Sequence, residues 1–421
     1  MKKLAAPLAI ALMALTISFV PMTGLAKAAP HKAKAARAGK TSVTNEQYAI
    51  PKGAVSTPGA SETPGVPNAP DVYARGYVLI DYATGQILAQ HEAETRMEPA
   101  SLTKLMTCYG VFRALKSGNL KLTDMVTISE HAWRSEGSRT FVQVGTQIPA
   151  EVLIKGMIVQ SGNDATIALA EKVGGTESAF VQMMNDNAKR LGMNNTHFDD
   201  ATGLPSPAHY TTAHDLALLA SALVREFPEY YSWFSLKEFV WNNIRQDNRN
   251  GLLEKDPTVD GLKTGHTDSA GYCLVSSAKR DDMRLISVVL GSPSIKARED
   301  ASAALLNYGY TFYQTVTIKK KGDVLLKPRV YKASQQFVPI GPITDVTMVI
   351  PRGQAGSIET SATAQPRLIA PLPATTPVGQ LQVVINGKPI KAVPLFPLND
   401  VPKGGFFGSL SDSVLLMFKK T

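Results

Sequence analysis

Strand-forming runs stand at both ends of a long helical block in this chain. The predicted strands, rich in β-branched and aromatic residues, are 77–82, 86–90, 261–265, 272–278 and 283–290. The predicted helices, with apolar residues at helical spacing, are 101–116, 152–160, 165–173, 178–191, 212–224 and 296–313. A sheet that draws strands from both groups can bury their apolar faces, so this order predicts an α+β domain over residues 71–313.

Changes in composition along the chain predict four further segments. They are a signal peptide at 1–28, a disordered linker at 29–70, a small all-β sandwich domain at 314–398 and an amphipathic helix at 403–421. Lys2 and Lys3 precede an apolar run, and a small-residue cleavage pattern follows at 26–28, which favours a signal peptide over a retained transmembrane helix. The linker has almost nothing apolar to bury. After Thr315, short β-rich runs are broken by Gly, Pro and Asn.

The formal net charge of the chain is +9 at pH 7. Such a basic excess suits anionic surfaces, for example a membrane or a wall polymer. The basic cluster at 31–37 lies in the predicted linker of an exported chain, so nucleic acid is not expected as a partner.

The C-terminal segment places large apolar residues on one side of a helix and serines with Asp412 on another. The apolar residues are Phe406, Phe407, Leu410, Val414, Leu415, Met417 and Phe418, and two lysines follow them. At about 16 residues the segment is too short to span a bilayer, and it suits a helix that lies in the membrane interface. The alternative is a terminal helix docked on its own domain.

Ser101 and Lys104 form an S-x-x-K pattern at the predicted start of a helix, directly after a proline and an alanine. Side chains three residues apart share one helix face, so Lys104 can reach the Ser101 hydroxyl and activate it as a nucleophile. Ser276 and Lys279 repeat the pattern in a predicted strand, where residues three apart point to opposite faces. The nucleophile is therefore assigned to Ser101.

Ser161, Gly162 and Asn163 lie in a loop between two predicted helices, where a hydroxyl and an amide can be presented to a site. Residues 117–119 repeat S-G-N at the far end of the Ser101 helix, about 24 Å along its axis, and their glycine is explained as a helix C-cap. Ser161 and Asn163 are thus the expected partners of Ser101.

Lys263, Thr264 and Gly265 form the only K-T-G of the chain, on a predicted strand. A lysine on a strand beside the nucleophile can bind a substrate carboxylate. A glycine there allows a substrate backbone to approach the strand closely.

Together the three motifs resemble the penicilloyl serine transferase family, whose penicillin-binding proteins and class A β-lactamases carry S-x-x-K, S-D-N and K-T-G. Gly162 departs from that pattern, and the S-G-N form is similar to the low-molecular-mass, class C penicillin-binding proteins of the D-alanyl-D-alanine carboxypeptidase type, peptidase family S11. The segments that carry the resemblance are 99–104, 161–165, 195–198, 248–253 and 259–267. It extends over about residues 71–421.

The resemblance implies a β-lactamase/transpeptidase-like domain, with an antiparallel sheet flanked by helices, followed by a β-sandwich and a membrane-anchoring helix. It implies a periplasmic enzyme, attached peripherally to the outer face of the inner membrane, that removes the terminal D-alanine from peptidoglycan pentapeptides and acts in cell-wall remodelling and cell shape. β-Lactam antibiotics would acylate it. No metal and no cofactor is implied.

The resemblance also implies roles for the site residues. Ser101 attacks the carbonyl, Lys104 takes its proton, and Ser161 and Asn163 position the peptide and relay a proton to the leaving D-alanine. Burial and the nearby charge of Lys263 are both expected to keep Lys104 neutral.

The remaining implied residues bind the substrate. The terminal carboxylate is expected to meet Lys263, Thr264, Arg249 and Arg298, although Arg298 could equally be a solvated helix charge. The backbone N–H groups of Ser101 and His266 would form the oxyanion hole, and the His266 side chain would shape the mouth of the site.

Two other functions are alternatives for this chain. A β-lactamase needs fast deacylation, but the only E-x-x-x-N between the second and third motifs, Glu238 to Asn242, lies in a predicted strand. A non-catalytic wall-binding protein requires that the serine and the lysine do not converge. Cys108 and Cys273, the only cysteines, are expected to be two buried thiols rather than a disulfide.

Overall fold

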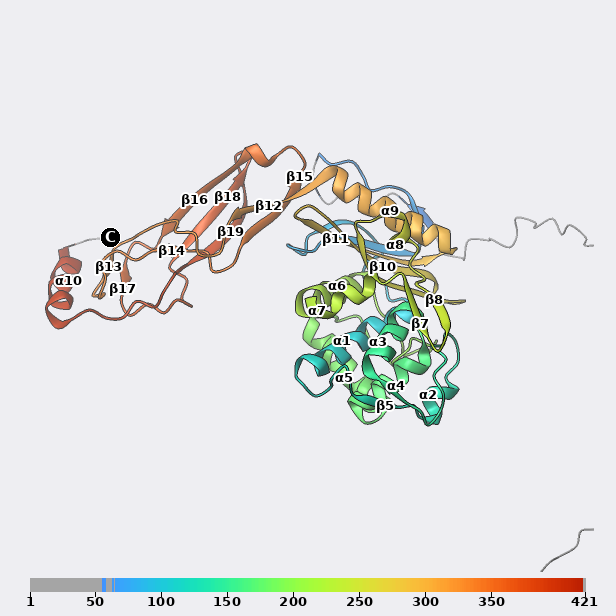
Figure 1. Cartoon of the computed structure of the whole chain (residues 1–421). Coiled ribbons are helices and arrows are strands. Elements are labelled where there is room, and N and C mark those ends of the chain that lie inside the picture. The colour runs from blue at the N-terminus through green and yellow to red at the C-terminus, as the bar shows by residue number, and fades with distance from the viewer. Residues whose placement is uncertain (1–54, 58–62, 64, 419–421) are drawn as a thin grey trace, which may run out of the picture. The chain divides into compact units, whose positions relative to one another are not determined.

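The computed structural model describes residues 55–57, 63 and 65–418 (Figure 1). The predicted signal peptide and the predicted linker up to residue 54 lie outside the described residues. The α+β domain follows, and a β domain begins directly after its last helix.

The α+β domain contains nine described α-helices. They are α1 (Lys104–Lys116), α2 (Glu130–Arg134), α3 (Ala150–Val159), α4 (Asn163–Gly174), α5 (Glu177–Leu191), α6 (Ala213–Glu226), α7 (Pro228–Tyr231), α8 (Leu252–Lys255) and α9 (Ile295–Phe312). Two 3₁₀ turns are η2 (Ala100–Thr103) and η3 (Ser232–Ser235). The predicted helices therefore exist, with bounds that differ by a few residues.

Five antiparallel strands form the main sheet of this domain, in the order β4-β3-β11-β10-β9. They are β3 (Gly76–Asp81), β4 (Ile87–His91), β9 (Val259–Thr267), β10 (Gly271–Arg280) and β11 (Met283–Ser292). β11 pairs with β3 at Val288↔Val78, which joins the two ends of the domain. The predicted α+β fold with one sheet drawn from both ends is confirmed.

The smaller strands of the domain pair outside this sheet. They are β1 (Val55–Thr57) with β2 (Val72–Ala74), β5 (Met125–Thr127) with β6 (Gln147–Pro149), and β7 (Glu238–Trp241) with β8 (Ile244–Asp247).

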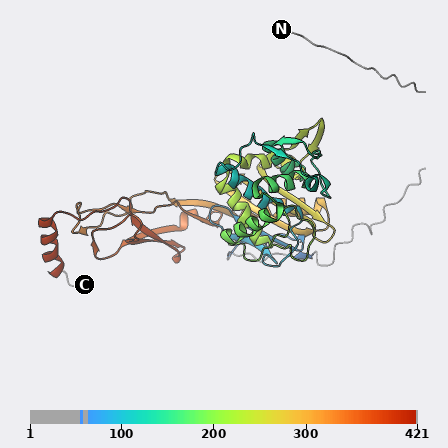
Figure 2. The same cartoon turned by 90° about the horizontal axis from the view of Figure 1, so that it is seen from below.

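The main sheet is buried on both faces because its strands alternate between two apolar cores. Val78 and Val288 belong to the core with α1, α3 and α6, whereas Leu79 and Val289 belong to the core with α9. Figure 1 shows α9 above the sheet and the helical block below it, and Figure 2, seen from below, shows the helical block overlapping the sheet. The sheet is thus a rigid support for residues at its β9 edge.

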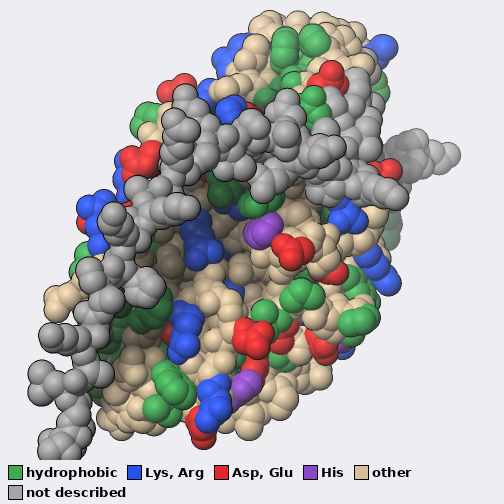
Figure 3. All heavy atoms as spheres, turned by 90° about the vertical axis from the view of Figure 1, so that its right-hand side faces the viewer, with side chains coloured by type: hydrophobic (Ala, Val, Ile, Leu, Met, Phe, Trp, Pro, Cys, Tyr) green, Lys and Arg blue, Asp and Glu red, His purple; other side chains and the backbone are tan. Residues whose placement is uncertain are grey.

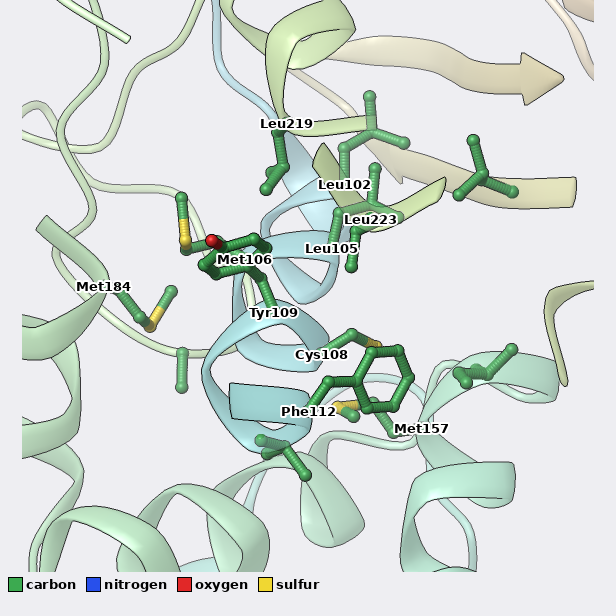
Figure 4. Packing of buried hydrophobic residues seen from close by; sticks show 14 of the residues in the cluster. Leu102, Leu105, Met106, Cys108, Tyr109, Phe112, Met157, Met184, Leu219 and Leu223 are labelled. Carbon is green, nitrogen blue, oxygen red and sulfur yellow. The ribbon is translucent and has the colours of Figure 1, made fainter. Parts of the chain in front are cut away.

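Helix α1 is the centre of the helical block. Its residues from Lys104 to Phe112 are buried, and aromatic, leucine and methionine side chains surround it on several sides (Figure 4). Tyr109 and Phe112 contact the ring of Phe227 edge-on, at centroid distances of 5.1 and 5.7 Å. Cys108 is a buried free thiol, as is Cys273, so the prediction of two unpaired cysteines is confirmed.

The end of the predicted linker differs from the structure. Residues 55–57 form β1 against β2, Ala69 is buried, and the Tyr308 hydroxyl donates a hydrogen bond to the Pro67 carbonyl at 2.7 Å. Val66 and Ala69 provide apolar surface that covers α9. The disordered linker predicted over 29–70 is therefore wrong for its last residues, which pack on the α+β domain.

The β domain has its own apolar core, formed from eight strands. They are β12 (Tyr313–Lys319), β13 (Val330–Tyr331), β14 (Ile340–Gly341), β15 (Val346–Pro351), β16 (Ile358–Ala364), β17 (Leu368–Ile369), β18 (Gly379–Ile385) and β19 (Lys388–Pro397). The largest sheet has the order β14-β19-β18-β16. The predicted all-β domain is confirmed. The 3₁₀ turn η4 (Ala355–Ser357) precedes β16. The sequence patterns did not predict β16 as a strand.

The last described element is α10 (Phe406–Phe418), at the predicted place of the amphipathic helix. Within residues 65–418, no helix combines the length and the apolar character that crossing a bilayer requires.

Candidate active site

Ser101 lies in the η2 turn, and Lys104 begins α1 directly after it. The Lys104 Nζ atom is 3.1 Å from Ser101 Oγ, within hydrogen-bonding distance. Ala100 has a positive φ of 48°, an uncommon backbone conformation for a residue other than glycine, and it bends the chain immediately before Ser101. The predicted convergence of the serine and the lysine is therefore present.

Lys104 is completely buried, and its Nζ donates a second hydrogen bond to the Thr202 carbonyl at 2.7 Å. Burial lowers the pKa of Lys104 to about 7, the carboxylate of Asp200 opposes this effect, and the charge of Arg249 adds to it. The expected neutral lysine is thus supported, although Arg249 supplies the neighbouring charge in place of the predicted Lys263.

Ser161 lies between α3 and α4, and Asn163 is the first residue of α4. Ser161 has a positive φ of 66°, and its buried Oγ has no hydrogen-bond partner among the described residues. Asn163 Nδ2 donates to the Glu136 carbonyl at 2.5 Å, and its Oδ1 is likewise buried without a described partner. A buried unpaired polar atom costs about 1–3 kcal/mol, so both atoms are suited to bind a substrate.

A loop at 136–142 lies against this motif. Asp164 is buried and accepts hydrogen bonds from the backbone N–H groups of Thr140 at 2.7 Å and Val142 at 3.2 Å. The N–H of Asn163 donates to the Ser138 carbonyl at 2.7 Å. Asn163 and Asp164 therefore hold the loop at the start of α4.

The glycine in the middle of S-G-N has a steric reason. A Cβ atom on Gly162 would stand 2.0 Å from Thr140 Oγ1 and 2.7 Å from the Thr140 backbone nitrogen. No side chain fits there, so the loop at Thr140 takes the space that an aspartate would need in an S-D-N motif.

Lys263, Thr264 and Gly265 lie on β9, the edge strand nearest the nucleophile. A Cβ atom on Gly265 would stand 3.0 Å from the Pro99 carbonyl oxygen and 3.2 Å from the Leu102 nitrogen. This glycine thus allows the strand to approach the η2 turn, and not only a substrate as predicted.

Lys263 is buried, and its Nζ donates to the Thr264 carbonyl at 3.0 Å. Burial lowers its pKa well below the usual value, and the charges of Lys104 and Arg249 act in the same direction. Basic side chains therefore gather beside the nucleophile.

These elements enclose a cleft of about 680 Å³. Its lining consists of Ser101, Gly137, Ser138, Ser161, Arg249, Thr264, Gly265, His266, Tyr272, Ile295 and Arg298. Figure 3 shows a hollow on the face seen from the right of Figure 1, with basic side chains and a histidine around it.

Arg298 is buried, with only 4% of its surface exposed, so it is not a solvated helix charge. Its guanidinium reaches the carbonyls of Gly265 at 3.4 Å and Arg249 at 3.2 Å. Burial lowers the pKa of both arginines from their usual values. Arg249 and Arg298 thus give the cleft a positive side that suits a carboxylate.

His266 stacks on Tyr272 across β9 and β10, with ring centroids 3.9 Å apart. Partial burial lowers the pKa of His266, and the charge of Arg298 adds to this while Asp268 opposes it. A histidine that is neutral at neutral pH fits the predicted role at the mouth of the site.

The two repeated motifs lie outside the cleft lining. Ser276 is buried in β10 opposite Leu262, and Ser117 follows the far end of α1. Glu238 lies on β7 and forms an ion pair with Arg245 at 2.7 Å, so it is not placed as a deacylating base. Within residues 65–418, no cluster of three His, Cys, Asp or Glu side chains is arranged to hold a metal ion.

Sequence reasoning missed several residues of the site. Ile295 and Tyr272 line the cleft, and the loop at 200–203 reaches Lys104 through a carbonyl. Backbone carbonyls and apolar lining residues form no recognisable sequence motif. The loop at 200–203 does carry one signal, because Asp200 followed by Thr202 and Gly203 is a composition typical of a turn.

A serine beside a neutral lysine, an unpaired hydroxyl and amide, and a positive pocket can together perform acyl transfer to a serine. The lysine can accept the serine proton, and the pocket can hold the carboxylate of a peptide end.

Two family models match this chain. The model described as D-alanyl-D-alanine carboxypeptidase matches residues 63–294, and the model described as the C-terminal domain of penicillin-binding protein 5 matches residues 313–403.

Curated relatives match most of the chain. The D-alanyl-D-alanine carboxypeptidase DacC of Escherichia coli is 44% identical over 83% of this chain and 90% of its own length. DacA of the same organism is 42% identical over 84% of this chain and 90% of its own length. Among solved structures, penicillin-binding protein 5 from Haemophilus influenzae is 40% identical, with a TM-score of 0.77 over 80% of this chain and 100% of that chain.

The matches include both domains, and each of the three motifs contributes to the cleft lining, through Ser101, Ser161, and Thr264 with Gly265. The chain therefore belongs to the D-alanyl-D-alanine carboxypeptidase family.

Proposed function

We propose that Ser101 is the nucleophile with which this D-alanyl-D-alanine carboxypeptidase removes the terminal D-alanine of peptidoglycan pentapeptides. The observation that carries the proposal is the 3.1 Å contact between Ser101 Oγ and the buried Nζ of Lys104. Lys104 accepts the hydroxyl proton while Oγ bonds to the carbonyl carbon of the penultimate D-alanine. The carbonyl oxygen takes up the negative charge, next to the backbone N–H groups of Ser101 and His266.

The second half of the reaction needs a proton for the leaving amine and then a water molecule. Ser161 relays the proton from Lys104 to the amine of the leaving D-alanine, and Asn163 positions the peptide. Water then attacks the ester carbon and releases Ser101. The unpaired Ser161 Oγ and Asn163 Oδ1 support this assignment.

The carboxylate of the terminal D-alanine binds at the positive side of the cleft. Thr264, Arg249 and Arg298 line the cleft, and they supply the donors together with Lys263. The burial of Arg298 strengthens a charge-assisted hydrogen bond. An internal peptide bond lacks this carboxylate, which explains a preference for the C-terminal residue.

Release of free D-alanine from a synthetic pentapeptide tests the proposal. The enzyme should release D-alanine, and Ser101→Ala should release none while it keeps the thermal midpoint of the parent. A Ser276→Ala variant is the matched control, because it removes the other S-x-x-K serine outside the cleft. Release by Ser101→Ala at the parental rate would refute the assignment.

β-Lactam binding follows from the same chemistry. A β-lactam carbonyl would acylate Ser101. Among the residues that the structure describes, no glutamate lines the cleft, so the adduct would be long-lived. A relative supports this: penicillin-binding protein D2 from Listeria monocytogenes, 30% identical with a TM-score of 0.53, has a solved structure in the ampicillin-bound form.

We also propose that the enzyme works in the periplasm, where it acts in cell-wall remodelling and cell shape, and that α10 attaches it to the outer face of the inner membrane. Asp412 is 5% exposed and accepts hydrogen bonds from Arg329 at 3.0 Å and the Lys332 N–H at 2.5 Å. The helix is thus docked on its domain through a polar residue.

The apolar side of α10 is left to solvent. Phe406, Leu410, Val414 and Met417 are exposed by 77%, 55%, 49% and 81%. A terminal helix that only packs on its own domain would bury these apolar side chains against that domain. Their exposure therefore supports a role in the membrane interface.

A further inference from the structure

Lys104 must direct a lone pair at Ser101 when it acts as a base. A neutral amine has one lone pair and two N–H groups, and the N–H groups need other acceptors. The Thr202 carbonyl, 2.7 Å from Nζ, is the closer of the two described hydrogen-bond partners. The position of this carbonyl therefore determines the orientation of the Lys104 amine, and with it the direction of the lone pair.

Asp200 fixes the backbone around that carbonyl. Its Oδ1 accepts three hydrogen bonds: from the Thr202 N–H at 2.5 Å, the Thr202 hydroxyl at 2.7 Å and the Gly203 N–H at 2.7 Å. A Cβ atom on Gly203 would stand 1.8 Å from the Ala100 carbonyl oxygen, so the loop lies directly on the residue before Ser101. One carboxylate oxygen thus organises the whole turn.

His209 joins the other carboxylate oxygen to the nucleophile turn. Its Nδ1 lies 3.2 Å from Asp200 Oδ2, and its Nε2 lies 2.8 Å from Thr103 Oγ1. His209 is 2% exposed, and Thr103 is completely buried. Because Thr103 stands directly before Lys104, the contacts form a closed ring from Lys104 through Thr202, Asp200 and His209 back to η2.

We propose that Asp200 and His209 are positioning residues for Lys104, and that they hold its amine in the orientation that accepts the Ser101 proton. The inference rests on the proposed role of Lys104 as the base. Nothing in the three motifs assigns these two residues, which lie about 100 positions further along the chain.

The same carboxylate acts on the charge of Lys104. Burial would raise the pKa of Asp200, but the hydrogen bond and charge of His209 hold it far below its usual value, so Asp200 is ionised at neutral pH. Its negative charge favours protonated Lys104, as does that of Asp164, whereas the charge of Arg249 disfavours it. Removal of the Asp200 charge should therefore make Lys104 a base at lower pH.

The test is the pH dependence of the second-order rate of acylation by a labelled penicillin, measured on the full chain. The parent rate should rise with pH through about 7, as Lys104 loses its proton. Asp200→Asn keeps an oxygen for the three donors and removes the charge, so this rise should move by about 0.5 to 1 pH unit to lower pH. Asp200→Ala also removes the acceptor, and its rate should fall at least about tenfold at every pH, since an unfixed amine loses its near-attack geometry.

Asp199→Asn is the matched control, because it removes a neighbouring exposed carboxylate that bonds Ser206 and should leave the profile unchanged. Thr103→Val removes the hydroxyl that bonds His209 and should lower the rate without the pH shift, which keeps the proposal testable if an Asp200 variant does not fold.

A profile of Asp200→Asn that coincides with the parent, together with parental rates for Asp200→Ala or Thr103→Val, would overturn the proposal. A different result would show that Lys104 is not the base. In that case Lys104→Ala would still be acylated, and the acylation rate of the parent would not rise near pH 7.

Discussion

At the scale of single residues, the site depends on positions where no side chain fits. Gly162 faces Thr140, and Gly265 faces the η2 turn, so each glycine allows one element of the cleft to close on another. Ser101 then lies within hydrogen-bonding distance of Lys104, and Ser161 and Thr264 line the same cleft. The chemistry of the motif residues therefore rests on the glycines between them.

Gly162→Ala tests this point. The added methyl would overlap Thr140 Oγ1, so the loop at Thr140 must move, and we expect the free energy of unfolding to fall by about 1–3 kcal/mol. The acylation rate should fall as well, because Ser161 and Asn163 flank the glycine. Urea denaturation and penicillin acylation measure the two effects.

Gly356→Ala is the control for this variant, because nothing lies within 4 Å of a Cβ atom at that position. It should leave both measurements unchanged. A Gly162→Ala enzyme with parental stability and acylation rate would contradict this prediction, because it would show that the loop at Thr140 moves aside without cost.

The motif residues could be predicted from the sequence because each carries a reactive group in a fixed spacing. Arg298 could not be separated from a solvated helix charge, since its burial depends on how α9 meets β9. Asp200 and His209 were missed because their contacts are set by tertiary folding across about 100 residues.

At the scale of elements, the start of α4 holds the loop that forms one wall of the cleft. Asp164 is fully buried and binds two backbone N–H groups of that loop, and Asn163 binds two of its carbonyls. The loop has no helix or strand of its own between 137 and 142. Its shape therefore depends on α4 rather than on local hydrogen bonding.

Asp164→Ala should loosen this loop. It leaves the N–H groups of Thr140 and Val142 buried without an acceptor, so the free energy of unfolding should fall by about 2–3 kcal/mol. Hydrogen exchange of residues 137–142 should accelerate before global unfolding. Asp186→Ala, at an exposed ion pair on α5, is the control, and exchange rates equal to that control would contradict this account.

The order of helices and strands in the α+β domain was predictable because its apolar residues follow clear helical and alternating periods. Strands of the β domain with few apolar residues were not predictable. β16 begins Ile358-Glu359-Thr360-Ser361-Ala362, and it is a strand because it pairs with β18. The low apolar content before Asp71 predicts a linker, yet Val66 and Ala69 suffice to pack on α9.

At the scale of the whole molecule, one chain combines an acyl-transfer domain with a β domain that ends in a partly exposed apolar helix. Asp412 fixes α10 on the β domain, and apolar side chains such as Leu410 and Val414 of this helix are exposed. The proposed catalytic residues are all in the α+β domain, so catalysis and the proposed membrane binding should be separable.

A double variant, Leu410→Glu with Val414→Glu, should detach the enzyme from anionic vesicles by at least about tenfold in partition, since charges replace buried apolar area in the interface. D-Alanine release should stay at the parental rate. Vesicle sedimentation measures the first effect.

Ile390→Glu changes an apolar residue of β19 that is 54% exposed, and it should bind vesicles like the parent. A chain that stops at Pro402 should no longer sediment with vesicles. Parental sedimentation of either the double variant or the shortened chain would contradict the anchoring role of α10.

The central claim is that Ser101 forms a covalent acyl-enzyme with help from Lys104. Mass spectrometry of the enzyme after incubation with penicillin, followed by peptide mapping, tests it most directly. One penicilloyl group should be found on Ser101, stable over many minutes, and absent from Ser101→Ala and Lys104→Ala variants that keep the parental fold. A group mapped to another residue, or rapid hydrolysis of penicillin with no adduct, would contradict the account.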